Sequence, residues 1–205
     1  MLDKVVSTLR GSVPLMLIAT VCAVSVLAWL SDAVKQALLL RPYFVKKKLH
    51  VHRLLTAGWV HVDGMHLAFN MVTLWFFAKD VLSVLGTAKF LALYVSAVVV
   101  AFIPTTIRHA DEKNYSSVGA SGAIAAVIFS AILLHPGMKL GLLFLPILVP
   151  GPIYGLAYLA YSVYQAWGER DGVNHTAHFA GAIYGVLFTY ALEPARVRYG
   201  LAHFF

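Results

Sequence analysis

The sequence predicts an all-α membrane protein with six transmembrane helices and an interfacial first loop. Of its 205 residues, 60% are hydrophobic and only 12% are charged, whereas soluble domains are about a quarter charged. The chain also contains six uncharged runs, most of which approach or exceed the roughly 20 residues that cross a bilayer as a helix. These runs cover residues 11–31, 64–78, 90–107, 114–138, 140–168 and 172–192.

Flanking charges and turn signals convert these runs into six expected spans in one membrane domain over residues 1–205. The first run follows Lys4 and Arg10 and is longer than the apolar core of a signal peptide, so we expect a retained helix. The second run must be extended past Lys79 and Asp80, where a lysine can snorkel. The expected spans are about 13–30, 64–85, 88–107, 118–134, 142–164 and 174–192.

The first connection, residues 32–63, mixes charged, aliphatic and aromatic residues. Short amphipathic helices in the membrane interface fit this composition better than a free linker. The net charge of +7 fits membrane lipids as partners, and no soluble domain offers a basic face to nucleic acid. The single Cys22 excludes an intramolecular disulfide. With alternating spans, seven basic residues fall on one side of the membrane and nine on the other, so the charge count leaves the orientation of the protein in the membrane open.

Three polar sites lie near the starts of the second, fourth and sixth spans, which alternation places on the same side of the membrane. They are His66 with Asn70, Ser121, and His178. Hydrocarbon offers such groups no hydrogen-bond partners. Polar side chains from three helices at similar depth therefore indicate a functional site.

Ser121 is the candidate nucleophile, because it lies near a helix N-terminus where free N–H groups can hold a developing oxyanion. Taken alone, its flanking glycines fit close helix packing better than chemistry. His178 is the candidate base: Gly181 and Gly185 would let its helix press against the fourth span. A histidine that only bonds a backbone carbonyl fits the same pattern. Every carboxylate lies at a span end or in a loop, so we expect a Ser–His dyad and no triad.

His66 and Asn70 are spaced i, i+4 and share one helix face, from which both can donate to an oxyanion. A structural polar pair between helices is the alternative. The chain has no His-Glu-x-x-His motif, which argues against a zinc metalloprotease, and no aspartate pair inside the spans. We expect no metal and no cofactor, although histidines on two helices could instead hold a haem or a metal ion.

These motifs together resemble a rhomboid intramembrane serine protease of the minimal six-helix bacterial type, over nearly the whole chain. The resemblance is carried by His61-x4-His66-x3-Asn70, Gly119-Ala120-Ser121-Gly122 and Ala177-His178-x2-Gly181-x3-Gly185.

The resemblance implies a serine endopeptidase that cleaves transmembrane segments of single-pass membrane proteins. It implies that Ser121 is the nucleophile, that His178 is the base, and that the Ser121 N–H, His66 and Asn70 form the oxyanion hole. Non-catalytic relatives that escort membrane clients usually lack the serine or the histidine, and both are present here. The residues expected to have structural roles near the site are Gly119, Gly122, Gly181, Gly185, Arg53 and His61.

Two positions depart from patterns common in bacterial members. His52 stands where a tryptophan often precedes the arginine, and Ala125 stands where a tyrosine often packs against the catalytic histidine. The second departure could loosen the orientation of His178. Small size and the lack of soluble domains favour a bacterial plasma membrane as the location.

The fifth span carries tyrosines that could line a lateral opening for substrate. An interfacial aromatic belt explains them at least as well. The residues concerned are Tyr154, Tyr158 and Tyr161, facing Trp75 and Phe76 of the second span.

Overall fold

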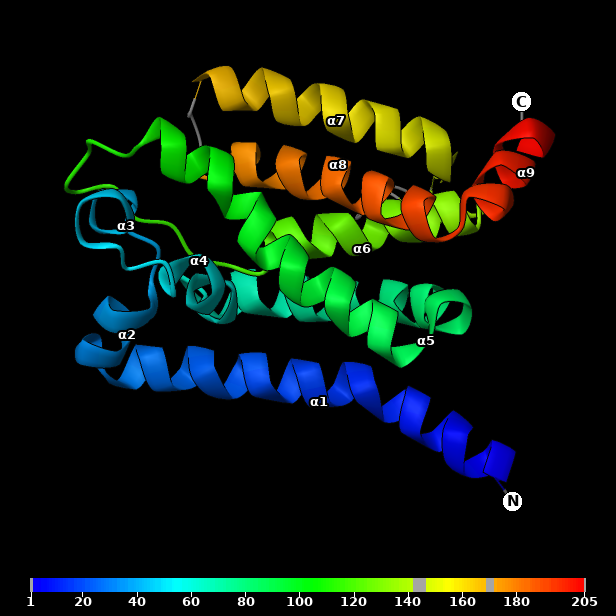
Figure 1. Cartoon of the computed structure of the whole chain (residues 1–205), viewed down its shortest axis with the longest axis horizontal. Helices are drawn as coiled ribbons and strands as arrows, with labels where there is room; N and C mark the ends of the chain where they lie inside the picture. The colour runs from blue at the N-terminus through cyan, green and yellow to red at the C-terminus, as the bar shows by residue number, and fades with distance from the viewer. Residues whose placement is uncertain (1, 142–146, 169–171, 205) are drawn as a thin grey trace.

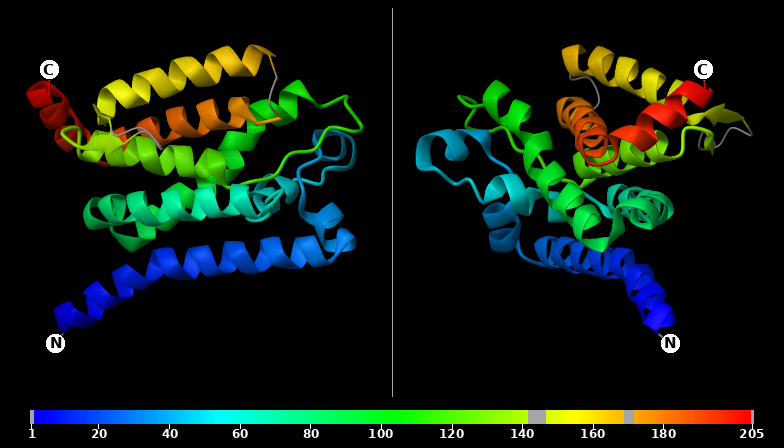
Figure 2. Two further views of the ribbon diagram at one scale, coloured as in Figure 1. Left: turned by 180° about the vertical axis from the view of Figure 1, so that it is seen from behind. Right: turned by 45° about the vertical axis from the view of Figure 1, so that its right-hand side comes forward.

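The computed structural model describes residues 2–141, 147–168 and 172–204, which are mainly helical. Figure 1 shows α6 inside the bundle against α5 and α8, with α1 and α7 on opposite outer sides. Both termini lie at one end of the molecule, and the short helices of the first loop lie at the other (Figure 2). The helices are α1 (Leu2–Leu30), α2 (Asp32–Leu38), α3 (Pro42–Lys48), α4 (Arg53–Thr56), the 3-10 turn η1 (Ala57–Trp59), α5 (Gly64–Arg108), α6 (Ser121–Leu134), α7 (Gly151–Gly168), α8 (His175–Leu192) and α9 (Pro194–Phe204).

Helix α5 consists of two helical arms that meet at Gly86. This residue has φ 73° and ψ 173°, a conformation that glycine adopts without the steric penalty of a Cβ. The arms, residues 64–85 and 87–108, overlap the second and third expected spans. Among the described residues, Ser12–Leu30 and Gly64–Arg108 are the two helices long and apolar enough to cross a membrane.

The first loop folds into the short helices α2, α3 and α4 followed by η1. Arg53 holds this region together: it is 9% exposed, and its Nη1 donates to the carbonyl oxygens of Gln36 and Leu39 at 2.7 Å each. The loop is thereby tied back to the end of α2. His52, in contrast, is exposed beside this arginine.

Helix α6 is short and buried on nearly every side, since twelve of its fourteen residues are buried. Two glycines of α8 face it. A Cβ at Gly181 would overlap the carbonyl oxygen of Gly122, and a Cβ at Gly185 would overlap that of Ala126. The backbones of α6 and α8 are therefore in direct contact, a packing mode that small residues permit between membrane helices.

The fourth expected span was placed from about residue 118, and the helix there, α6, begins at Ser121. Gly119 has φ 119°, so the helix cannot continue backwards through it. The chain before it is extended, and Ser117 and Leu40 exchange two backbone hydrogen bonds of 3.0 and 3.1 Å.

The expected fifth span, 142–164, also begins too early. Residues 142–146 lie outside the described residues, and Leu148–Pro150 form strand β2, which pairs antiparallel with β1 (Lys139–Gly141). Helix α7 starts only at Gly151. Pro152 suits a first helical turn, because the N–H that proline lacks has no partner there.

Helix α9 was not predicted. Pro194 follows α8 after a single residue, Glu193. It also starts α9, because its fixed φ suits the first helical position.

The contact between α6 and α8 predicts the effect of Gly181→Ala. The added methyl group would overlap the Gly122 carbonyl, so we expect a loss of about 1–3 kcal/mol in stability, as for other overpacked interiors. Thermal unfolding of the detergent-purified protein measures this loss. Gly137→Ala is the matched control, because a Cβ at Gly137 would have no atom within 4 Å. Equal melting temperatures for the two variants would contradict the packing argument.

Candidate active site

Ser121 is the first residue of α6, and the residues before it are held in place by the first loop. The Gly119 N–H donates to the Ala57 carbonyl at 3.0 Å, and the Ala120 N–H donates to His61 Nε2 at 3.3 Å. A Cβ at Gly119 would lie 2.7 Å from Cε1 of His66. The positive φ and this close approach together require glycine here.

His178 lies within hydrogen-bond reach of Ser121: its Nε2 is 2.6 Å from Ser121 Oγ. The histidine sits on the first turn of α8, where its backbone N–H donates to the Asn174 carbonyl at 3.2 Å. Because Gly181 follows three residues later and touches α6, the imidazole is brought to the start of that helix. A nucleophile and its base require this separation.

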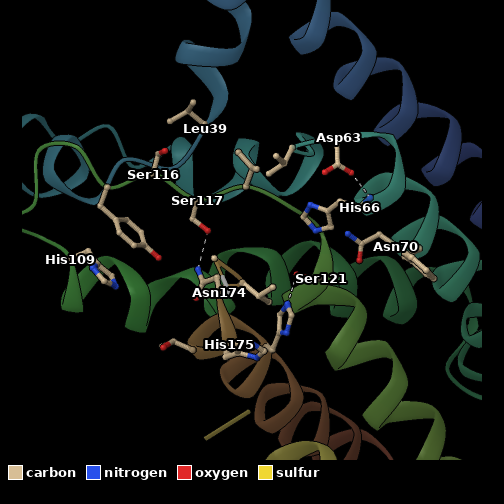
Figure 3. Close-up of a pocket in the computed structure, with 18 of the residues that line it drawn as sticks. Leu39, Asp63, His66, Asn70, His109, Ser116, Ser117, Ser121, Asn174 and His175 are labelled. Carbon is tan, nitrogen blue, oxygen red and sulfur yellow. Dashed lines mark hydrogen bonds between the residues drawn. The ribbon is translucent and has the colours of Figure 1, made fainter. Parts of the chain in front are cut away.

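His66 and Asn70 lie on the first turns of α5 and point toward the same space as Ser121 (Figure 3). Asp63 starts this helix, accepting the His66 N–H at 2.8 Å. Asn70 is 6% exposed, and its Nδ2 has no hydrogen-bond partner among the described residues. A buried donor without an acceptor costs about 1–3 kcal/mol, and such a donor is suited to a charge that appears only during a reaction.

These side chains line one cavity of about 910 Å³ that extends from Ser121 toward α2 and the start of α8. Asp63 is the one carboxylate among the described residues of its lining, and it caps α5. The expectation of a dyad therefore stays a prediction, consistent with this lining. Among the described residues, no three histidine, cysteine or acidic side chains gather as metal ligands.

Aromatic rings surround the imidazole of His178. The Tyr158 ring stacks on it with centroids 6.4 Å apart, and the His175 ring meets it edge-on at 5.6 Å. Tyr158 also contacts Phe129 of α6 at 5.8 Å. The ring that Ala125 lacks on α6 is thus supplied from α7. The spacing of the tyrosines was visible in the sequence, but the side on which Tyr158 packs was not.

Asn174 is a site residue that sequence reasoning missed. Its Oδ1 accepts from Thr105 Oγ1 at 2.9 Å and from the Ala177 N–H at 3.0 Å, and its Nδ2 donates to Ser117 Oγ at 3.0 Å. It therefore caps the helix that carries His178 and ties it to α5 and to the segment before Ser121 (Figure 3). An asparagine before a helical run is a recognisable N-cap signal.

His61 is fully buried between η1 and α5. Burial, with a smaller contribution from neighbouring His66, lowers the pKa of its imidazole to about 4, and Asp63 opposes the shift. The ring is therefore neutral near pH 7. In the neutral state Nε2 can accept the Ala120 N–H, beside Ser121.

Comparison of this sequence with known proteins finds matches to one family. A model of the rhomboid domain matches residues 48–195. The presenilin-associated rhomboid-like protein, mitochondrial, of Homo sapiens is 32% identical over 145 residues, which cover 68% of this chain and 38% of that protein. Rhomboid protein 1, mitochondrial, of Saccharomyces cerevisiae is 29% identical over 169 residues, covering 77% of this chain and 46% of that protein. The chain thus spans between about a third and a half of the length of such relatives.

These relatives correct the expected location. A bacterial plasma membrane was inferred from small size and composition, but these features do not determine in which membrane a protein resides. The relatives from fish, mammals, a plant and yeast are all named as mitochondrial proteins. The expectation of a bacterial membrane is therefore wrong.

The buried state of His61 predicts a dependence of stability on pH. The pKa of His61 is lower in the folded chain than in the unfolded chain, so between pH 6.5 and about 4 this histidine is protonated in the unfolded state and neutral in the folded state. The free energy of unfolding should therefore fall as the pH drops from 6.5 to about 4, by on the order of 3 kcal/mol at most. Melting temperatures of wild type and His61→Gln across this range measure the difference, with His52→Gln as the exposed control. Parallel curves for all three proteins would refute the prediction.

Proposed function

The chain belongs to the rhomboid family, and from that premise we propose that it is an intramembrane serine endopeptidase. Its substrates would be single-pass membrane proteins, cut in or beside their transmembrane segment. The observation that supports this most is the 2.6 Å separation of Ser121 Oγ and His178 Nε2. Both side chains line a cavity that Asn70 also lines, and the Nδ2 of Asn70 has no hydrogen-bond partner among the described residues.

The reaction is acyl transfer through a Ser–His dyad. His178 Nε2 takes the proton of Ser121 Oγ as the oxygen attacks the scissile carbonyl carbon. The resulting oxyanion accepts hydrogen bonds from the Ser121 N–H, His66 and Asn70. The C–N bond then breaks, and the leaving amine takes the proton from His178. Water from the cavity, deprotonated by His178, hydrolyses the ester and regenerates Ser121.

We propose that six helices cross the membrane: α1, the two arms of α5, α6, α7 and α8. Helix α6, at 14 residues, is about 21 Å long, shorter than the roughly 30 Å hydrocarbon core. Ser121 would therefore lie below the membrane surface, and the cavity would bring water to it. A substrate helix must unwind locally, because its carbonyl oxygens are otherwise engaged within the helix.

The first loop and the location complete the proposal. The helices α2, α3 and α4 would lie in the interface, with the lysines of α3 near lipid head groups. A mitochondrial membrane is the proposed location, because the relatives are named as mitochondrial.

The activated serine is tested by fluorophosphonate labelling of the detergent-purified protein. Wild type should label at Ser121, Ser121→Ala should not label, and His178→Ala should label about 10²–10⁴-fold more slowly, as expected when a general base is lost. Ser130→Ala is the matched control: it removes a buried serine of the same helix, bonded to Thr189 at 2.7 Å. A wild type that fails to label where another rhomboid protease labels would overturn the proposed function.

The oxyanion hole is tested with Asn70→Ala and a cleavable single-pass model substrate. Loss of one donor should lower kcat by about 10²–10³-fold and leave KM nearly unchanged, because the bond forms only in the transition state. Thr73→Ala is the control on the same arm, since among the described residues its hydroxyl bonds only the local Phe69 carbonyl, at 2.7 Å. An unchanged kcat in Asn70→Ala would remove Asn70 from the mechanism.

A further inference from the structure

Ser25 is a buried hydroxyl on an otherwise apolar face of α1. It is 0% exposed, like Val21 one turn before it, and Ala28 is 1% exposed. A hydroxyl in such a place is costly unless it is hydrogen-bonded. Helix α1 also lies outside residues 48–195, the part of the chain that the rhomboid domain model matches.

The partners of Ser25 define one direction for a chain of hydrogen bonds. The Ala120 backbone N–H can only donate, so His61 Nε2, 3.3 Å away, must accept. The neutral imidazole then carries its proton on Nδ1, which donates to Ser25 Oγ at 3.0 Å. The Ser25 hydroxyl in turn donates its single proton to the Trp59 carbonyl at 2.9 Å.

The opposite tautomer does not fit these contacts. With a proton on Nε2, the ring would face the Ala120 N–H with a second donor. Nδ1 would then have to accept from Ser25, whose single proton is already used by the Trp59 carbonyl. Ser25 is therefore the acceptor that stabilises the tautomer required by Ala120.

The same face of α1 also holds the backbone of His61. Trp29, one turn beyond Ser25, donates from Nε1 to the His61 carbonyl oxygen at 2.8 Å. Helix α1 thus holds both the ring and the main chain of this histidine.

Ala120 connects this arrangement to the reacting serine. It is the residue before Ser121, and its carbonyl accepts the Ile124 N–H at 2.9 Å in the first turn of α6. The N–H of Gly119 is anchored on Ala57. The entry to α6 is therefore held at two consecutive N–H groups, one of which depends on the tautomer of His61.

We propose that Ser25 is a positioning residue for the reaction at Ser121. It acts through His61, whose Nε2 it keeps free to bind the Ala120 N–H. This role rests on the proposed function only in that Ser121 is the reacting group. It assigns α1, which the rhomboid domain model does not match, a part in holding the active site.

Fluorophosphonate labelling of the full chain tests the effect on Ser121. Ser25→Ala should slow labelling between about 10- and 100-fold, because a small displacement of a reacting group has a cost of this order. Ser25→Thr keeps the hydroxyl and should restore most of the rate. Thr20→Ala is the matched control, because within the described part of the chain that hydroxyl bonds only the Leu17 carbonyl of its own helix, at 2.8 Å. A Ser25→Ala protein that labels as fast as wild type would overturn the positioning role.

The tautomer provides a readout that a purely structural role would not change. In protein with ¹⁵N-labelled histidine, the His61 signals are assigned by their absence in His61→Gln. Wild type should show a protonated Nδ1 and an unprotonated Nε2 near pH 7, and Ser25→Ala should populate the opposite tautomer. A wild-type His61 protonated on Nε2 would overturn the proposal, even if Ser25→Ala failed to fold.

The two proposals fail in different ways. Wild type that does not label argues against the protease and leaves the tautomer of His61 unaffected. If wild type labels at Ser121 and Ser25→Ala labels equally fast, the proposed protease function stands and the positioning role of Ser25 is refuted.

Discussion

The backbone contact between α6 and α8 is the constraint on which the remaining structure depends. Gly181 and Gly185 lie against carbonyl groups of α6, at a distance that excludes any side chain. Ser121 begins one helix and His178 lies on the first turn of the other, so this contact also sets their separation of 2.6 Å. The glycines that permit this close packing therefore also determine how near Ser121 and His178 lie.

A bundle in hydrocarbon must pair its internal polar groups, because no water is present to do so. Some of the described residues do so with bonds between different helices, such as Ser130 with Thr189 at 2.7 Å and Ser96 with Tyr184 at 2.8 Å. Asn70 is one of a few buried polar side chains, Tyr94 among them, that have an atom without a hydrogen-bond partner within the described part of the chain, and it lies in the cavity beside Ser121. An unpaired donor beside a paired Ser–His couple is the pattern expected of a site that stabilises charge only during a reaction.

Aromatic rings from two helices pack against the imidazole of His178. Tyr158 stacks on it from α7, and His175 meets it from its own helix. The small residue at Ala125 is matched by this ring from another element. The aromatic contact to this histidine that is common in bacterial members is therefore present here, although the ring belongs to a different helix.

The sequence alone predicted the helical class, the boundary between the spans 64–85 and 88–107, and the family, because apolar runs and spaced polar residues are local signals. It failed where tertiary contacts decide. The strand at Leu148–Pro150 forms through pairing with β1, and α6 starts at Ser121 because the first loop holds Gly119 and Ala120. The roles of Ser25 and Tyr158, and the bonds of Asn174 to Thr105 and Ser117, were hidden for the same reason. Each acts on a residue at least 20 positions away or across a helix contact, and no local pattern records which side chains such packing brings together.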